Sequence, residues 1–152
     1  MIYYKLDFTC ETDAREVIEA ELPNNVYFNE CDSDSFYTSL EKGVNEIEKS
    51  LVALKSKYPF MKSYQIEDYG LHGEFFTIRS SFECDKLPED LQRFKIDVIA
   101  AIENTSFEVA TVYWTLLSQA TYWEPAEYED HEVSGKARFY NIHPLIITKH
   151  ED

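Results

Sequence analysis

One apolar stripe constrains the fold of this chain more than any other feature of the sequence. Its members recur at intervals of three or four residues, and they are Phe36, Leu40, Val44, Ile47, Leu51, Leu54 and Tyr58. This spacing predicts a helix of about 22 residues with one apolar face. Asp32 and its neighbours supply capping residues before the stripe, and Pro59 ends it. Such a face can form a coiled-coil seam, but in a chain this short we expect it to pack on the chain's own sheet.

Alternation of apolar and polar residues predicts β-strands on both sides of this helix. In residues 2–9 the side chains of Ile2, Tyr4, Leu6 and Phe8 fall on one face. We expect further strands at residues 26–28, 63–69, 74–82, 106–117, 133–140 and 142–148, with a turn at residues 70–73 and a bulge or turn at Gly135. For residues 106–117 a helix is the alternative to a strand, because the alternation weakens from Leu116 onward.

Two more helices complete the predicted order. Asp13 and Glu16 fit a capping box for a short helix ending near Glu21, and Pro88 suits the first turn of a second long helix. The order lacks strict βαβ repetition, which favours an α+β fold. We therefore expect an antiparallel or mixed β-sheet with two long helices and one short helix packed on one face. We expect residues 1–152 to form a single globular domain.

The charge balance decides which classes of partner suit this chain. It carries 29 Asp and Glu against 14 Lys and Arg, a net charge of −15, while hydrophobic residues make up 44%. This composition predicts a folded domain with an acidic surface, which repels nucleic acid and anionic lipid and attracts basic proteins. No apolar stretch is long enough to span a membrane. Three isolated cysteines and the lack of a signal peptide predict a cytoplasmic protein.

The acids are concentrated in one segment that also contains aromatic residues. Between Lys95 and Lys136 there are eight acids and no Lys or Arg. We predict a partner-binding loop in this segment, formed by Trp123, Glu124, Glu127, Tyr128, Glu129, Asp130 and Glu132. The alternatives are a solvated face that only keeps the protein soluble and a Trp123 that is buried in the core. A second acidic run, from Glu11 to Glu41, has nine acids opposed only by Arg15.

The sequence offers little catalytic chemistry. It has no spaced metal-ligand motif, no glycine-rich phosphate loop and no nucleophile elbow, so we predict no metal, no cofactor and no enzymatic activity. The strongest catalytic alternative is His72, which lies between two glycines and precedes Glu74 by two residues. That pair could serve as a general acid and base in a small enzyme.

In composition the chain resembles two functional groups of small acidic proteins, although no specific motif carries the resemblance. These are immunity proteins that neutralise basic nuclease toxins, and phage-encoded anti-defence inhibitors or nucleic-acid mimics. The resemblance implies an inhibitor that binds a basic, nucleic-acid-handling protein such as a nuclease. A structural or adaptor protein that self-associates is the alternative, as a homodimer formed through the helix stripe or through a sheet edge.

Overall fold

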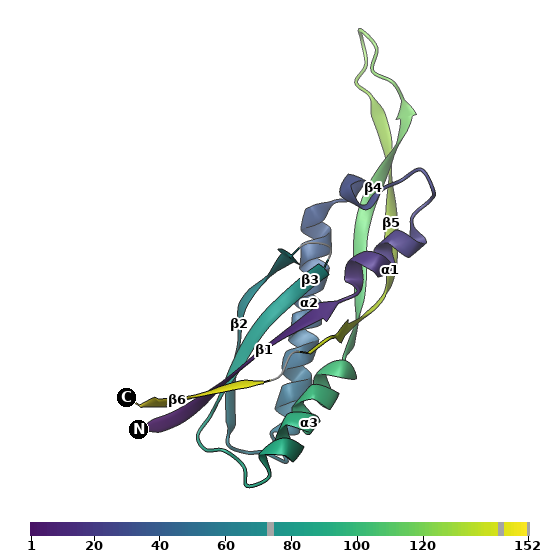
Figure 1. The fold of residues 1–152 in the computed structure, drawn as a ribbon. Helices are drawn as coiled ribbons and strands as arrows, with labels where there is room; N and C mark the ends of the chain where they lie inside the picture. The colour runs from purple at the N-terminus through teal and green to yellow at the C-terminus, as the bar shows by residue number, and fades with distance from the viewer. Residues whose placement is uncertain (73–74, 143–144, 152) are drawn as a thin grey trace.

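The structure is a computed structural model that describes residues 1–72, 75–142 and 145–151 (Figure 1). Within these ranges ten elements follow one another: β1 (Ile2–Thr12), α1 (Ala14–Glu21), the 3₁₀ helix η1 (Phe28–Glu30), α2 (Ser33–Leu54), β2 (Met61–His72), β3 (Phe75–Cys84), α3 (Leu91–Glu103), β4 (Ser106–Ser118), β5 (Glu127–Tyr140) and β6 (Ile146–Glu151). The predicted α+β class is confirmed. None of the helices in the described ranges is long and apolar enough to cross a membrane.

The sheet is antiparallel throughout the described residues and is strongly curled. Its strand order is β2-β3-β1-β5-β4, with β6 on β1 beside this path. β1 is the central strand of the sheet. On one side Tyr4–Thr12 pair with β3, and on the other side Ile2–Asp7 pair with β6 and Glu11–Thr12 pair with β5. The short β1–β5 junction lets the β4–β5 hairpin turn away from the other strands (Figure 1).

The core lies between the inner face of this sheet and the helices. Alternate residues of β1, namely Leu6, Phe8 and Cys10, are fully or almost fully buried, as the period of a half-buried strand requires. The apolar stripe of α2 is buried from Phe36 through Leu51, so it packs on the chain's own sheet and is not a free coiled-coil seam. Burial of this stripe is the main reason that the segment stays helical, since packing stabilises helices more than propensity does.

The helix starts are fixed by local hydrogen bonds. The Asp32 carboxylate accepts from the Ser35 N–H at the start of α2, as predicted. α3 begins at Leu91 and not at Pro88, because the Asp90 carboxylate accepts from the Arg93 N–H at 3.0 Å. The predicted capping box of α1 is absent, because Asp13 instead accepts from the backbone N–H of Arg138 on β5.

The strand predicted at residues 26–28 is wrong. This segment leads into η1, where Phe28 packs edge-on against Phe36 with 4.9 Å between ring centroids. The guanidinium of Arg15 lies over the ring of Phe28, 4.9 Å from its centroid. Aromatic and β-branched residues favour strands only where a partner strand is present. Here the Phe28 ring packs against α2 and no strand forms at residues 26–28.

The bulge or turn predicted at Gly135 is also wrong. Gly135 lies inside the continuous strand β5, opposite Val109 of β4. A Cβ atom at this position would overlap the side chain of Val17, so the glycine lets α1 pack closely on β5. This close approach depends on a residue far away in the sequence, which the local pattern around Gly135 does not reveal.

Candidate protein-binding surface

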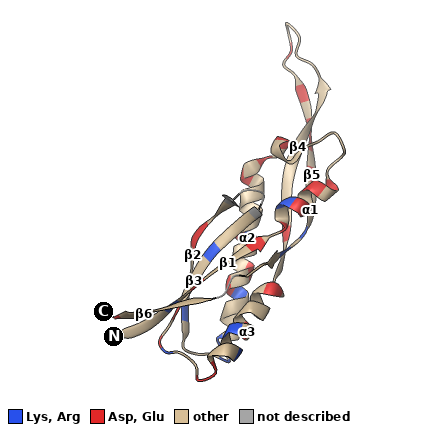
Figure 2. Ribbon diagram, viewed as in Figure 1, with Lys and Arg blue, Asp and Glu red and all other residues tan. Residues whose placement is uncertain are grey.

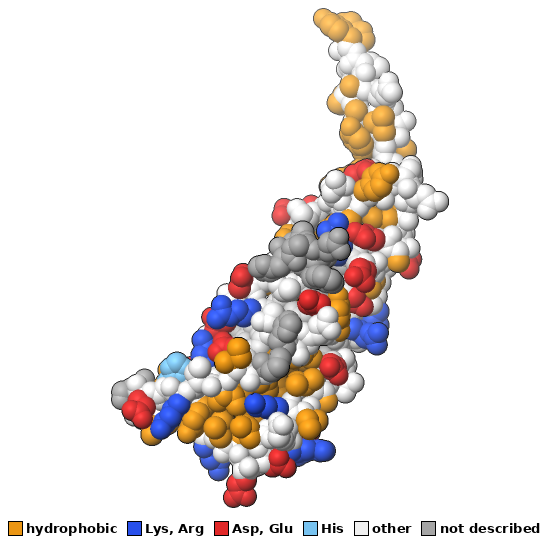
Figure 3. Space-filling view, in the orientation of Figure 1, with side chains coloured by type: hydrophobic (Ala, Val, Ile, Leu, Met, Phe, Trp, Pro, Cys, Tyr) orange, Lys and Arg blue, Asp and Glu red, His pale blue; other side chains and the backbone are white. Residues whose placement is uncertain are grey.

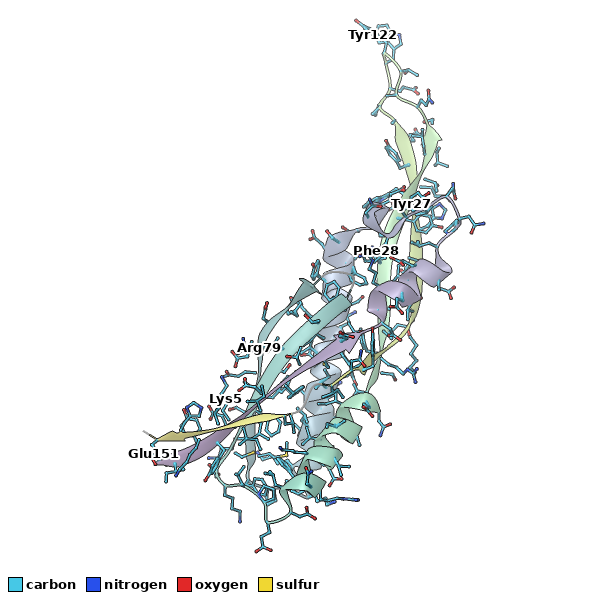
Figure 4. The ribbon with its side chains drawn as sticks, in the orientation of Figure 1. Lys5, Tyr27, Phe28, Arg79, Tyr122 and Glu151 are labelled. Carbon is cyan, nitrogen blue, oxygen red and sulfur yellow. The ribbon has the colours of Figure 1, made fainter. Side chains whose placement is uncertain are left out.

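The outer half of the β4–β5 hairpin extends beyond the rest of the molecule (Figures 1 and 4). We call residues 113–132 the arm and the remaining described residues the body. In the body, the inward side chains of β4 are buried at Phe107, Val109 and Thr111. No described residue from 112 to 132 is buried, because the helices end below this level. The arm is therefore a two-stranded structure without a core of its own.

One face of the arm is apolar. The strand register places Trp114 opposite Asp130 and Leu116 opposite Tyr128, so these four side chains share a face. Trp114 and Leu116 are each 49% exposed and Tyr128 is 60% exposed. Figure 3 shows hydrophobic side chains gathered along this protrusion and at its end. Trp114, Tyr128 and Asp130 line a shallow hollow, which has an acidic group at the edge of an aromatic surface.

The opposite face of the arm is organised by His131. Its ring stacks on Tyr113 with 5.0 Å between centroids, and its Nε2 lies 2.8 Å from the Thr115 hydroxyl. Glu129 lies on the same face, with a carboxylate oxygen 3.6 Å from His131 Nε2. These cross-strand contacts fix the twist and register of the arm in the absence of a core.

The tip of the arm is a tight turn that presents two aromatic rings. The Thr121 hydroxyl accepts from the N–H groups of Trp123 and Glu124, and the Thr121 N–H donates to the Glu124 carbonyl at 2.8 Å. Tyr122 and Trp123 therefore occupy the two central positions of the turn, where they are 90% and 86% exposed. Their rings meet edge to face with 4.8 Å between centroids. The alternative of a Trp123 buried in the core is excluded.

The predicted partner-binding residues all lie in the arm, but their secondary structure differs from the prediction. Trp123 and Glu124 belong to the turn, whereas Glu127, Tyr128, Glu129, Asp130 and Glu132 belong to β5. The predicted loop is thus wrong for these five residues, which pair in register with β4. The pairing brings Tyr128, Asp130 and Glu132 to the face of Trp114 and directs Glu129 to the other face.

Two residues of this surface, Trp114 and Leu116, were not predicted to have a functional role. In the sequence they fall on the face of the strand opposite Phe107 and Val109, where the alternation of a half-buried strand predicts solvent-exposed residues without a specific role. The signal that separates them is the neighbouring composition: no charged residue occurs between Glu108 and Glu124. An uncharged strand that ends in an exposed aromatic turn is unusual on a surface this acidic.

The acids of the arm have no Lys or Arg near them. Of the ion pairs in the described residues, the only one with a carboxylate of the arm joins Glu129 to His131. Figure 2 shows no Lys or Arg on the projecting part of the hairpin. The negative potential of Glu124, Glu127, Asp130 and Glu132 is therefore not neutralised within this part of the molecule, and it attracts cationic groups.

Other candidate sites are weaker. His72 is the last residue of β2, and its side chain and Glu74 lie outside the described residues. Within the described ranges, no group of three His, Cys, Asp or Glu side chains could hold a metal ion. Burial raises the pKa values of the Cys10 and Cys84 thiols to about 12, which keeps both protonated and unreactive.

Comparisons with known proteins do not identify a function for this surface. No protein family model, curated protein or solved structure matches the chain. Its function must therefore be argued from the arm itself, whose features are an aromatic tip, an apolar face and uncompensated acids.

Proposed function

We propose that this protein is an inhibitor that binds a basic protein through its arm. The observation that carries the proposal is the pair Tyr122 and Trp123, which are held almost fully exposed by an ordered turn at the end of an acidic protrusion. A chain loses solubility by presenting such rings to water, and Tyr and Trp are preferred anchors of protein interfaces. Docking against a partner would remove both rings from water.

The charges favour a basic protein over other partners. A net charge of −15, with five acids in residues 124–132, opposes contact with nucleic acid and with anionic lipid. The same acids would accelerate encounter with a basic cleft, and the aromatic residues would then slow dissociation by filling desolvated pockets. Acids and rings thus have separate roles in one binding event.

The shape of the arm suggests where on the partner it binds. An arm that is two strands wide is narrow enough to enter a cleft, whereas the body is wider (Figure 1). Nucleic-acid-handling proteins, nucleases among them, carry basic clefts that fit an acidic protrusion. We therefore propose that the arm blocks such a cleft. The three free cysteines favour a reducing compartment, so we propose that the partner is cytoplasmic.

The proposal is tested by identifying the partner and then measuring how substitutions of the acids and of the aromatic rings change its association and dissociation rates. Tagged protein captures binders from its native cells at low salt, and mass spectrometry identifies both the binders released at high salt and those retained. With the purified partner, reversing Glu127, Glu129 and Asp130 to Lys should slow association by about tenfold or more. Trp123→Ala should mainly speed dissociation.

Two outcomes would contradict the proposal. One is a captured partner whose association and dissociation rates are unchanged by both sets of substitutions. The other is a partner that is acidic and is held more tightly as salt rises, since screening should weaken the proposed attraction.

A further inference from the structure

The outer edge of β4 is open along the arm and covered along the body. At the body, the Ser39 hydroxyl accepts from the Ala110 N–H at 3.0 Å and donates to the Ala110 carbonyl at 2.9 Å. The Asp32 N–H donates to the Val112 carbonyl at 2.7 Å. Residues of even number on β4 therefore direct their backbone groups away from β5, and α2 with its preceding residue bonds to both groups of Ala110 and to the carbonyl of Val112.

The alternation of an antiparallel pair extends this pattern into the arm. Trp114 and Leu116 have the same parity as Ala110 and Val112, and the register with β5 stays unbroken as far as Leu116. Their backbone N–H and C=O groups therefore also point outward. Within the described residues, no element hydrogen-bonds to the backbone of either residue. The chain covers this edge at Ala110 and Val112 and leaves it free to pair with another strand at Trp114 and Leu116.

The two edges of the arm differ in chemistry. β5 carries four acids between Glu127 and Glu132, which oppose pairing with a copy of itself. β4 has no charge, proline or glycine from Val109 to Ser118, so it lacks the devices that protect exposed edges. An uncharged, β-prone edge is complementary to itself in an antiparallel pairing. A two-stranded arm is also only marginally stable alone, and added strands would stabilise it.

We propose that two copies of this chain associate through the β4 edge of the arm, with residues 113–117 of each copy paired antiparallel about a twofold axis, so that the outward backbone groups of Trp114 face those of Leu116 in the second copy. The pairing would build a four-stranded sheet in the order β5-β4-β4-β5 and would join the two apolar faces formed by Trp114, Leu116 and Tyr128. It stops at Val112, because α2 covers the edge from there inward.

The acids favour this arrangement over one through β5. In the four-stranded sheet the two β5 strands lie outermost, about 14 Å apart across three strand spacings. That separation exceeds the Debye length of about 8 Å at physiological salt, so the arms repel each other only weakly. Each copy carries a net charge of −15, so added salt should screen the remaining repulsion and strengthen the dimer, whereas it should weaken the proposed binding of a basic partner.

The test is sedimentation velocity of the full chain from micromolar to millimolar concentration, at low and high salt. We expect a concentration-dependent dimer that is strengthened by salt. Leu116→Pro removes an outward N–H without breaking a β4–β5 hydrogen bond, and it should weaken the dimer by about tenfold or more. Leu116→Ala is the matched control, because it shortens the same side chain but keeps the N–H and should dimerise more strongly than Leu116→Pro.

Circular dichroism checks that each variant folds, and Leu116→Lys gives a second edge-blocking variant if the proline is not tolerated. A wild-type chain that stays monomeric throughout, or a dimer that salt dissociates, would overturn the proposal. Equal weakening by Leu116→Pro and Leu116→Ala would also overturn it, since a side-chain contact would then explain the association. The test needs no partner protein, so its result is independent of the proposed inhibitor function.

Discussion

The body and the arm share the same two strands but use them differently. In the body, the inward residues of β4 pack against α2, and Phe107 stacks on Phe139 at 5.1 Å between centroids. Further out on this inward face, Tyr113 is only half-buried and stacks on His131, while Trp114 and Leu116 lie on the opposite face and are each 49% exposed. One uninterrupted hairpin thus supplies a core where α2 packs on its inward face, and an exposed apolar surface on the outward face of its outer end.

The largest expected effect is on the free energy of unfolding, which should depend on a buried ring in the body far more than on an exposed ring in the arm. Phe94 is fully buried and packs against Tyr58, Phe60 and Phe82. Phe94→Ala should lower the free energy of unfolding by about 3–5 kcal/mol, because it removes buried area and leaves a cavity. Urea unfolding followed by circular dichroism measures the loss.

Trp123→Ala is the matched control in the arm. It removes a larger ring, yet it should change the free energy of unfolding by no more than about 0.5 kcal/mol, since the ring is in water. Similar losses for Phe94→Ala and Trp123→Ala would mean that the tip packs against the body, and the distinction between the two regions would fail.

A medium effect is expected where α2 meets β4. A Cβ at Gly43 would lie 2.8 Å from the ring of Phe107, which is too close. Gly43→Ala should therefore destabilise the body by about 1–3 kcal/mol, despite the higher helix propensity of alanine. Gly70→Ala on β2 is the control, because a Cβ there meets nothing within 4 Å, and it should be neutral or stabilising. If Gly43→Ala proves as stable as wild type, the close contact of α2 with β4 is wrong.

The smallest effect concerns acid stability. Hydrogen bonds from Lys57 at 2.9 Å and from Tyr58 at 2.6 Å hold the pKa of Asp97 below its ordinary value. The folded state therefore binds this proton less readily than the unfolded chain does, so the contribution of Asp97 is present above the ordinary pKa and is lost as pH falls through the lowered one.

Asp97→Asn should accordingly reduce the loss of stability on acidification, as measured by thermal unfolding across the acidic range. Asp130→Asn is the control in the arm, because its carboxylate has no hydrogen-bond or ion-pair partner among the described residues. A steeper acid profile for Asp97→Asn than for wild type would contradict the sign of this linkage.

Periodic elements of the fold could be predicted from the sequence. The stripe from Phe36 to Leu51 and the alternation of Leu6 and Phe8 are local patterns, and each reports which face is buried. The acidic half of β5 could not be predicted in this way. Acids are depleted in strands, and residues 127–132 have no inward apolar set, so only the pairing with β4 makes them a strand.

The candidate surface was predictable in part for the same reason. Trp123 and the acids stand out by composition, so the sequence alone indicates a surface suited to a basic partner. Trp114 and Leu116 stand out only by the uncharged sequence around them. They lie on the face of β4 opposite the buried Phe107, and strand periodicity does not show whether another element covers that outward face.

The central claim is that the arm, and not the total charge, recognises a basic partner. The most direct test compares two triple reversals of equal net charge: Glu127, Glu129 and Asp130 to Lys in the arm, and Glu21, Glu48 and Glu89 to Lys on exposed sites of the body. Association rates with the captured partner are measured by stopped flow at several salt concentrations. The account predicts about tenfold slower association for the arm variant and a much smaller change for the body variant. Equal slowing by both variants would contradict it, because the long-range charge of the whole molecule would then account for binding.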